Sequence, residues 1–260
     1  MKIIAPGALA LAITAAITAA ITAAITAAVI AAVTVAVAVA TAANACAADA
    51  AVAPFSAHYD AQWRSITVGV SDLELAADGS PDHYVYTWKI IAHGIFRLIY
   101  ARPITQKSWF ELQGNRVLPI RYRADDGSTS VALDFDWASG RARGSSGGRP
   151  IDLSIKEGTQ DLLSIQMQIM QDLRTGEVPK TFLIVDKDEV KDFNYTDEGT
   201  ARIRTTLGML DTRVVSTQRS GSNRILRMWF APSLDYAPVQ AERTRAGALE
   251  FAMRIRTLTR

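Results

Sequence analysis

From Phe55 to the C-terminus, short runs rich in β-branched and aromatic residues alternate with clusters of turn-forming residues. The spacing of about ten residues between clusters is typical of successive short strands that bury alternate side chains. Turn signals such as Asp78-Gly79-Ser80-Pro81-Asp82 separate the runs, because Gly tolerates positive φ and Pro fixes its own. The pattern predicts strands at Phe55–Trp63, Ile66–Leu75, His83–His93, Ile104–Leu112, Val117–Arg123, Val131–Trp137, Thr181–Val185, Val190–Tyr195, Arg202–Thr206, Thr212–Thr217, Arg224–Phe230, Val239–Arg243 and Leu249–Thr257.

Two intervening segments lack this strand pattern. Ser139–Pro150, which combines four Gly with three Arg, is predicted to be an exposed loop. Thr159–Arg174 is predicted to be an amphipathic helix, with a start capped by Thr159 or Asp161 and an end at Gly176. Its apolar residues recur at steps of three and four, opposite a polar face of Gln166, Gln168, Gln171 and Asp172. The apolar face consists of Leu162, Ile165, Ile169 and Leu173.

Because no crossover helices separate the predicted strands, an α/β fold is disfavoured. We expect a mainly β fold, a large antiparallel β-roll or open barrel with one amphipathic helix packed on it. The expected organisation is an export segment at residues 1–47, a short linker at 48–54 and a single β-rich domain at 55–260.

The N-terminal segment has the features of a cleavable signal peptide. After Lys2 no charged residue occurs before Asp49, and small residues end the apolar run at two A-x-A sites, 43–45 and 45–47. An uncleaved membrane anchor is the alternative, because an apolar run of about 18 residues can span a bilayer. Lipidation of Cys46 is a third hypothesis, although no Leu stands three positions before it. All three predict export, and we expect a periplasmic protein.

Composition excludes several function classes. The net charge of +2, from 28 basic and 26 acidic residues, gives no electrostatic basis for binding nucleic acid. One cysteine rules out an internal disulfide and a thiolate metal cluster. The three histidines have no zinc-ligand spacing, and the nucleophile-elbow, P-loop and dinucleotide motifs are absent from the sequence. We therefore expect no cofactor and no metal.

The remaining candidate sites each have a simpler structural explanation. Asp134 and Asp136 share one strand face and could act as paired carboxylates on a sugar, or form ion pairs with Arg121 or Arg123. Arg121 and Arg123 could instead bind an anionic group. Trp137 and Trp229 could line an apolar ligand cavity or belong to a filled core.

Several short stretches, in order along nearly the whole chain after the export segment, resemble an exported bacterial family, domain of unknown function 3108. The resemblance implies a β-rich periplasmic protein and transfers no activity and no catalytic residue. The stretches are Tyr59–Trp63 followed by Gly69, Leu118–Arg123, Leu133–Trp137, Asp161–Ser164, Thr206–Gly208 and Trp229–Val239.

These observations favour a non-catalytic protein that binds an envelope component, either a lipid or a lipidated or protein partner, in a β-rich groove or cavity. One alternative is a structural or scaffolding protein in envelope assembly. The other is a cell-wall sugar hydrolase that uses Asp134 and Asp136. Direct membrane contact is expected only if the N-terminal segment stays attached.

Overall fold

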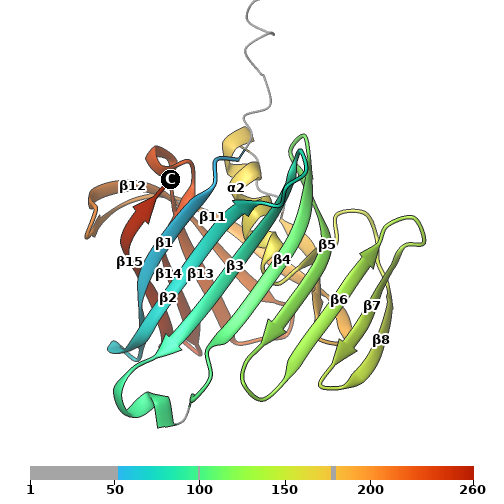
Figure 1. The fold of residues 1–260 in the computed structure, drawn as a ribbon. Coiled ribbons are helices and arrows are strands. Elements are labelled where there is room, and N and C mark those ends of the chain that lie inside the picture. The colour runs from blue at the N-terminus through green and yellow to red at the C-terminus, as the bar shows by residue number, and fades with distance from the viewer. Residues whose placement is uncertain (1–51, 99, 177–179) are drawn as a thin grey trace, which may run out of the picture. The chain divides into compact units, whose positions relative to one another are not determined.

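The computed structural model describes residues 52–98, 100–176 and 180–260, and Val52–Arg260 form one compact unit (Figure 1). The predicted export segment, residues 1–47, lies outside the described residues. Among the described residues, no helix is both long and apolar enough to cross a membrane.

Strands make up most of the described chain, with one α-helix and two short 3-10 helices among them. In chain order the elements are β1 (Phe55–Trp63), β2 (Ile66–Ala77), β3 (His83–Ala92), η1 (Gly94–Leu98), β4 (Ile104–Gln113), β5 (Arg116–Asp125), β6 (Ser130–Asp136), β7 (Arg141–Ser146), β8 (Arg149–Ser154), β9 (Gln160–Asp161), α2 (Ser164–Thr175), β10 (Thr181–Asp186), β11 (Glu189–Thr205), β12 (Gly208–Arg219), β13 (Arg224–Ala231), η2 (Pro232–Leu234), β14 (Ala237–Arg245) and β15 (Ala248–Thr259).

All fifteen strands belong to one sheet, in the order β8-β7-β6-β5-β4-β3-β2-β1-β15-β14-β13-β12-β11-β10-β9. Neighbouring strands are antiparallel except for β9 and β10, which are parallel and connected through α2. The first and last strands, β1 and β15, pair with each other in the middle of the sheet. They join its two meanders, of which the first consists of β1–β8 and the second of β9–β15. β8 and β9 are the two ends of the order, so the sheet is open. The prediction of a mainly β, antiparallel roll or open barrel with one helix is confirmed.

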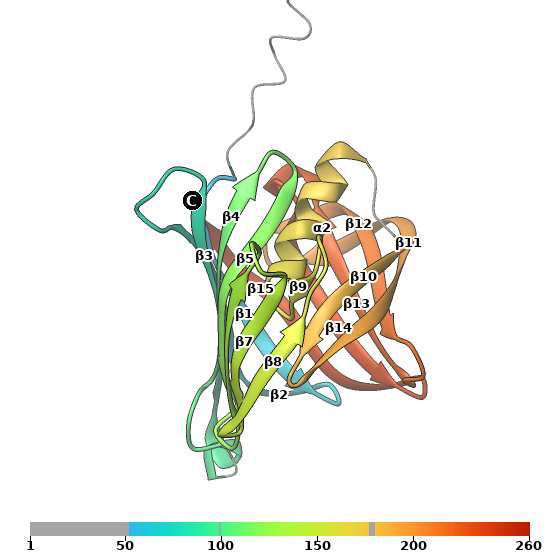
Figure 2. The ribbon, with the colours of Figure 1, turned by 90° about the vertical axis from the view of Figure 1, so that its right-hand side faces the viewer.

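The two meanders face each other, and α2 lies between them at one end of the strands (Figure 2). Alternating side chains of both meanders and the apolar residues of α2 form one continuous core. Fully buried members include Tyr59 and Phe110 of the first meander, Val215 and Phe230 of the second, and Ile169 of the helix. Tyr59 also donates its hydroxyl to the carbonyl oxygen of Pro238 at 2.5 Å, a bond from β1 to β14.

The predicted loop at Ser139–Pro150 is wrong, because β7 and the start of β8 occupy it. Gly147 and Gly148, with φ of 56° and 78°, form the two-residue turn of the β7–β8 hairpin, for which positive φ at both positions is required. Gly144 lies so close to β6 that a Cβ would overlap the carbonyl oxygen of Ala132. These glycines therefore permit a tight hairpin and do not indicate a flexible segment.

Two boundaries also differ from expectation. The predicted strands Val190–Tyr195 and Arg202–Thr206 are parts of one strand, β11, which a register shift between Asp197 and Gly199 bends without interrupting. The helix begins at Ser164 and not at Thr159, because Gln160–Asp161 pair with β10 as β9. It ends at Gly176 as predicted, with φ of 88° at that residue.

Candidate functional site

The sheet opens a gap where β6 separates from β5. Their pairing runs from Asp125 with Ser130 to Arg121 with Asp134 and stops there. Pro119, which precedes Arg121 by two residues in β5, has no N–H to donate to a neighbouring strand. The carbonyl oxygen of Pro119 accepts a hydrogen bond from the indole N–H of Trp137 at 2.8 Å. A side chain thus takes the place of backbone pairing at this point.

Two glutamines cover the part of β5 that β6 leaves. Gln160 of β9 donates its Nε2 to the carbonyl oxygen of Val117 at 2.8 Å. The N–H of Val117 donates to Oε1 of Gln168 of α2, also at 2.8 Å. Gln168 in turn donates to the carbonyl oxygen of Asn115 at 3.0 Å and to Oδ1 of Asp172 at 2.8 Å. We call this connection, defined by Val117, Gln160 and Gln168, the seam.

A buried carboxylate anchors the helix beside the seam. Oδ2 of Asp161 accepts from the Ser108 hydroxyl of β4 at 2.7 Å. Oδ1 accepts from the backbone N–H groups of Leu163 and Ser164 at 2.8 and 2.7 Å. Burial raises the pKa of Asp161, and the hydrogen bonds from Ser108, Ser164 and Leu163 act in the opposite direction. The carboxyl therefore fixes the start of α2 to the first meander.

A cleft of about 640 Å³ adjoins the seam. Gln160 and Gln168 lie in its wall, and Oε1 of the buried Gln160 has no hydrogen-bond partner among the described residues. At the exposed rim, Arg116 forms an ion pair with Glu157. Its apolar lining comes from β5, β10 and the segments around them: Val117, Leu118, Trp137, Ile155, Phe182 and Leu183.

Of the residues that the sequence predicted as sites, the structure places Trp137 in the cleft and the others elsewhere. Arg121 and Arg123 lie at the surface and both contact Oδ1 of Asp134, at 3.2 and 3.0 Å. The ion pairs that the sequence offered as the simpler explanation of Asp134 are therefore present. Trp229 is buried in β13 of the other meander.

The Asp136 carboxylate accepts hydrogen bonds within its own turn. Its carboxylate accepts from the N–H and hydroxyl of Ser139 at 3.1 and 2.5 Å and from Arg143 at 3.3 Å. The hydrogen bonds from Ser139 lower the pKa of Asp136 below its usual value. Neither Asp134 nor Asp136 lines the cleft. The lowered pKa of Asp136 suits an ion-pairing carboxylate better than a general acid.

The sequence did not identify the glutamines of the seam as a site. It placed Gln168 and Asp172 on a polar helix face, whereas both are buried in the structure. Gln160 fell inside the predicted helix and did not suggest a strand. Asp161 was one of the two predicted caps, and its carboxylate accepts hydrogen bonds from the N–H groups of Leu163 and Ser164 at the helix start. The sequence feature that could have indicated the seam is the group of amide side chains, Gln166, Gln168 and Gln171, on a helix that packs against a sheet. Amides buried in such a position need specific hydrogen-bond partners.

The family described as "Protein of unknown function (DUF3108)" matches residues 58–253. The chain belongs to this family. Leu118–Arg123, Leu133–Trp137 and Asp161–Ser164, three of the stretches on which the resemblance rested, include residues of the β5–β6 gap, the cleft and the helix anchor.

Two solved structures are also similar to the DUF3108 chain. One, from Bacteroides fragilis, is described as an exported protein with a YmcC-like fold; it has 8% identity, covers 79% of this chain and 95% of its own, and has a TM-score of 0.35. The other, described as a lipoprotein of Parabacteroides distasonis, has 9% identity, coverage of 80% and 96%, and a TM-score of 0.35. A likeness of this degree carries no inference about function. A search of curated proteins finds no match.

Proposed function

We propose that this DUF3108 protein is an exported, non-catalytic binder of an amphiphilic envelope molecule, which it holds in the cleft beside the seam. The observation that carries the proposal is the cleft of about 640 Å³ with apolar walls and a charged rim. Small-molecule sites typically have volumes of about 300–1,000 Å³ and combine apolar walls with a few polar groups.

The lining divides into two chemical parts. Leu118, Trp137 and Leu183 offer a surface for a hydrocarbon portion, whose burial is favourable by about 25 cal/mol per Å². Arg116 and Glu157 at the rim can pair with a charged or zwitterionic group that remains in water. A ligand with both an apolar and a polar end matches this arrangement.

The lining also favours binding over catalysis. Among the described residues, Glu157 is the one carboxylate of the lining and Thr181 its one hydroxyl-bearing side chain. This described part of the lining offers neither a pair of carboxylates for glycoside hydrolysis nor a nucleophile beside a histidine. The scaffolding and hydrolase alternatives stay predictions without a feature of this cleft in their favour.

The test is mass spectrometry of organic extracts from the protein purified from the periplasm. We expect a bound amphiphile in the wild type and about tenfold less in Leu183→Arg, because the new charge lies in an apolar wall. Leu226→Arg is the matched control, since Leu226 is similarly half-buried in β13 and does not line the cleft.

Circular dichroism and a melting curve for each variant establish that the fold is retained. Titration with the fluorescent probe N-phenyl-1-naphthylamine provides a second readout that is independent of the natural ligand. The proposal fails if wild-type extracts repeatedly contain no amphiphile, or if Leu183→Arg retains ligand and probe as well as Leu226→Arg does.

A further inference from the structure

Large apolar side chains are exposed at two adjacent hairpin ends. Leu98, Ile95 and Ile66 are 83%, 71% and 56% exposed, which is unusual for residues of this size. Turns normally carry small or polar residues at such positions. We call the group the apolar tip, and its members are Trp63, Ile66, Ile95, Leu98 and Tyr100.

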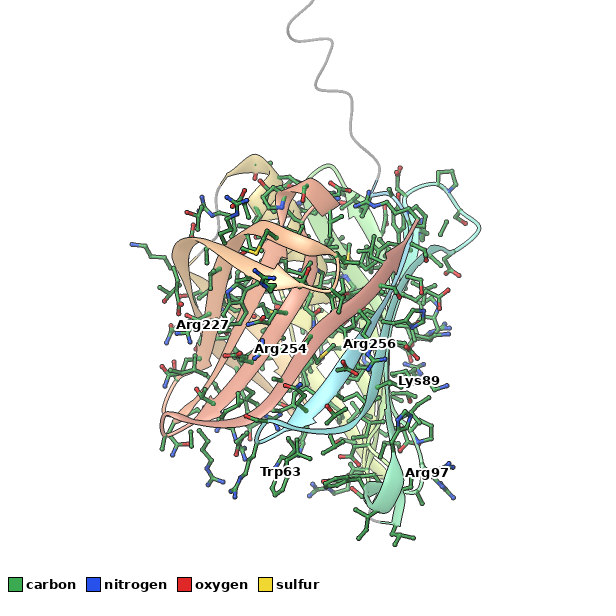
Figure 3. The ribbon with its side chains drawn as sticks, turned by 90° about the vertical axis from the view of Figure 1, so that its left-hand side faces the viewer. Trp63, Lys89, Arg97, Arg227, Arg254 and Arg256 are labelled. Atoms are coloured by element: carbon green, nitrogen blue, oxygen red, sulfur yellow. The ribbon has the colours of Figure 1, made fainter. Side chains whose placement is uncertain are left out.

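The tip is one surface and not a set of scattered residues. Trp63 and Ile66 are paired across the β1–β2 turn. The N–H of His93, directly before η1, donates to the carbonyl oxygen of Val68 in β2 at 2.8 Å. This bond holds the β3–β4 connection against the β1–β2 hairpin. Both segments lie at the same end of the sheet, away from α2 (Figure 1), and Figure 3 labels Trp63 and Arg97 at this end.

Three arginines flank the tip. The Arg64 guanidinium lies 4.9 Å from the centre of the Trp63 ring. Arg97 is in η1, and Arg102 follows it in the same connection. Within the part of the chain that the structure describes, none of these three arginines forms an ion pair.

Arginines on the outer face of the sheet behave differently. Figure 3 labels three of them, and each has a carboxylate partner within 2.7 Å. The partners are Glu198 for Arg227, Glu242 for Arg254 and Asp60 for Arg256. The acidic residues nearest the tip in the sequence, Asp60 and Asp72, already pair with Arg256 and His58. Asp125 and Asp126 accept hydrogen bonds from the N–H groups of their own turn. Cationic charge therefore remains available around the tip.

We propose that the apolar tip docks the protein onto an anionic lipid surface. Trp and Tyr favour the boundary between hydrocarbon and headgroups, and Arg can extend its charge to lipid phosphates while its stem stays among apolar groups. Five side chains at hairpin ends are few for a stable protein interface, which buries about 1,200–2,000 Å². They suffice for shallow, reversible insertion assisted by anionic lipid.

The test is flotation of the exported full protein with vesicles. We expect binding to phosphatidylcholine–phosphatidylglycerol vesicles, weaker binding to pure phosphatidylcholine, and a decrease as salt rises. Ile95→Ser with Leu98→Ser should weaken binding about tenfold, because two exposed apolar groups no longer enter the lipid. Arg97→Gln should remove much of the preference for the anionic vesicles.

Leu207→Ser with Met209→Ser is the matched control, since these two residues are also exposed but lie at the β11–β12 turn. All variants share one N-terminus, so membrane affinity from that segment is common to them. Equal binding by the tip variant and the control overturns the proposal, as does a wild type that binds neither vesicle. Self-association that Ile95→Ser with Leu98→Ser abolishes, without vesicle binding, also overturns it and assigns the tip to contact between copies. Ligand extraction from the cleft is unaffected by these outcomes.

Discussion

The environments of Asp172 and Asp136 shift the pKa of the two carboxyl groups in opposite directions. Asp172, in the last turns of α2, is 5% exposed, accepts one hydrogen bond from Gln168 and leaves Oδ2 without a partner among the described residues. Burial raises its pKa to about 6, and the bond from Gln168 acts against this shift. A negative charge near a helix C-terminus is also disfavoured by the helix dipole. For Asp136 at the surface, hydrogen bonds from Ser139 lower the pKa.

Replacing Asp172 with Asn should stabilise the protein above pH 6. Because the folded pKa exceeds the unfolded value, the native state binds more protons between the two values, and stability falls as pH rises through that window. We expect Asp172→Asn to raise the free energy of unfolding by about 1–2 kcal/mol at pH 8, with the difference vanishing near pH 4. Urea unfolding at both pH values measures it.

Asp136→Asn is the control with the opposite sign. Its lowered pKa contributes stability above the unfolded pKa, which is lost as pH falls through the folded one. The Asn variant should therefore lose stability at pH 8 and match the wild type in acid. A higher free energy of unfolding for both variants at pH 8 would contradict the opposite pKa shifts of Asp172 and Asp136.

At the scale of elements, the seam replaces a missing strand by side chains. Gln160 and Gln168 satisfy the backbone of Val117, which β6 does not reach. A buried backbone group that loses its partner costs about 1–3 kcal/mol. The connection from β9 and α2 to β5 therefore depends on two amides and not on a continuous ladder.

We expect Gln160→Ala with Gln168→Ala to lower the free energy of unfolding by about 2–4 kcal/mol, since both polar groups of Val117 lose their partners. Amide hydrogen exchange at Val117 should accelerate far more than exchange in β12 and β13. Gln166→Ala is the control, because Gln166 is on the same helix and only accepts a longer bond, of 3.4 Å, from Tyr86. Unchanged exchange at Val117 in the double variant would show that the seam is not held by these glutamines.

Periodicity explains why the elements were largely predictable and the seam was not. Strands such as β1 and β2 alternate buried and more exposed side chains over short distances, so their own sequence specifies them. The partners of Gln160 and Gln168 lie 43 and 51 positions away, and no local pattern encodes such a distance. Gly147 and Gly148 led to the wrong prediction of a loop, because glycine is common both in tight hairpin turns and in open loops. Trp137 and Trp229 were proposed as cavity residues on the same aromatic character; Trp137 lies in the cleft lining and Trp229 is buried in the core, a difference that residue type alone does not encode.

At the scale of the molecule, both meanders share one core and one central strand pair, β1 with β15. The buried apolar residues that the structure describes form one cluster across both meanders. We therefore expect a single cooperative transition in urea. Trp229 is the one tryptophan of the second meander, so variants that retain only Trp229, or only Trp88 of the first, report on each half by fluorescence.

The two probes should give the same midpoint and slope. A midpoint for Trp229 that differs from that for Trp88 would show two folding units. Unfolding of each variant is also followed by far-ultraviolet circular dichroism. This signal reports the strands of both halves together and is the reference for the two fluorescence curves.

The pairing of β1 with β15 also sets when the protein can be completed. β15, which bridges the two halves, follows every other described strand in the chain, so the halves can be joined only after all those strands have been synthesised. Loss of Ala248–Thr259, by a premature stop codon or a protease, removes a strand from the middle of the sheet and not from its edge. A chain interrupted within β15 should therefore be degraded during biogenesis.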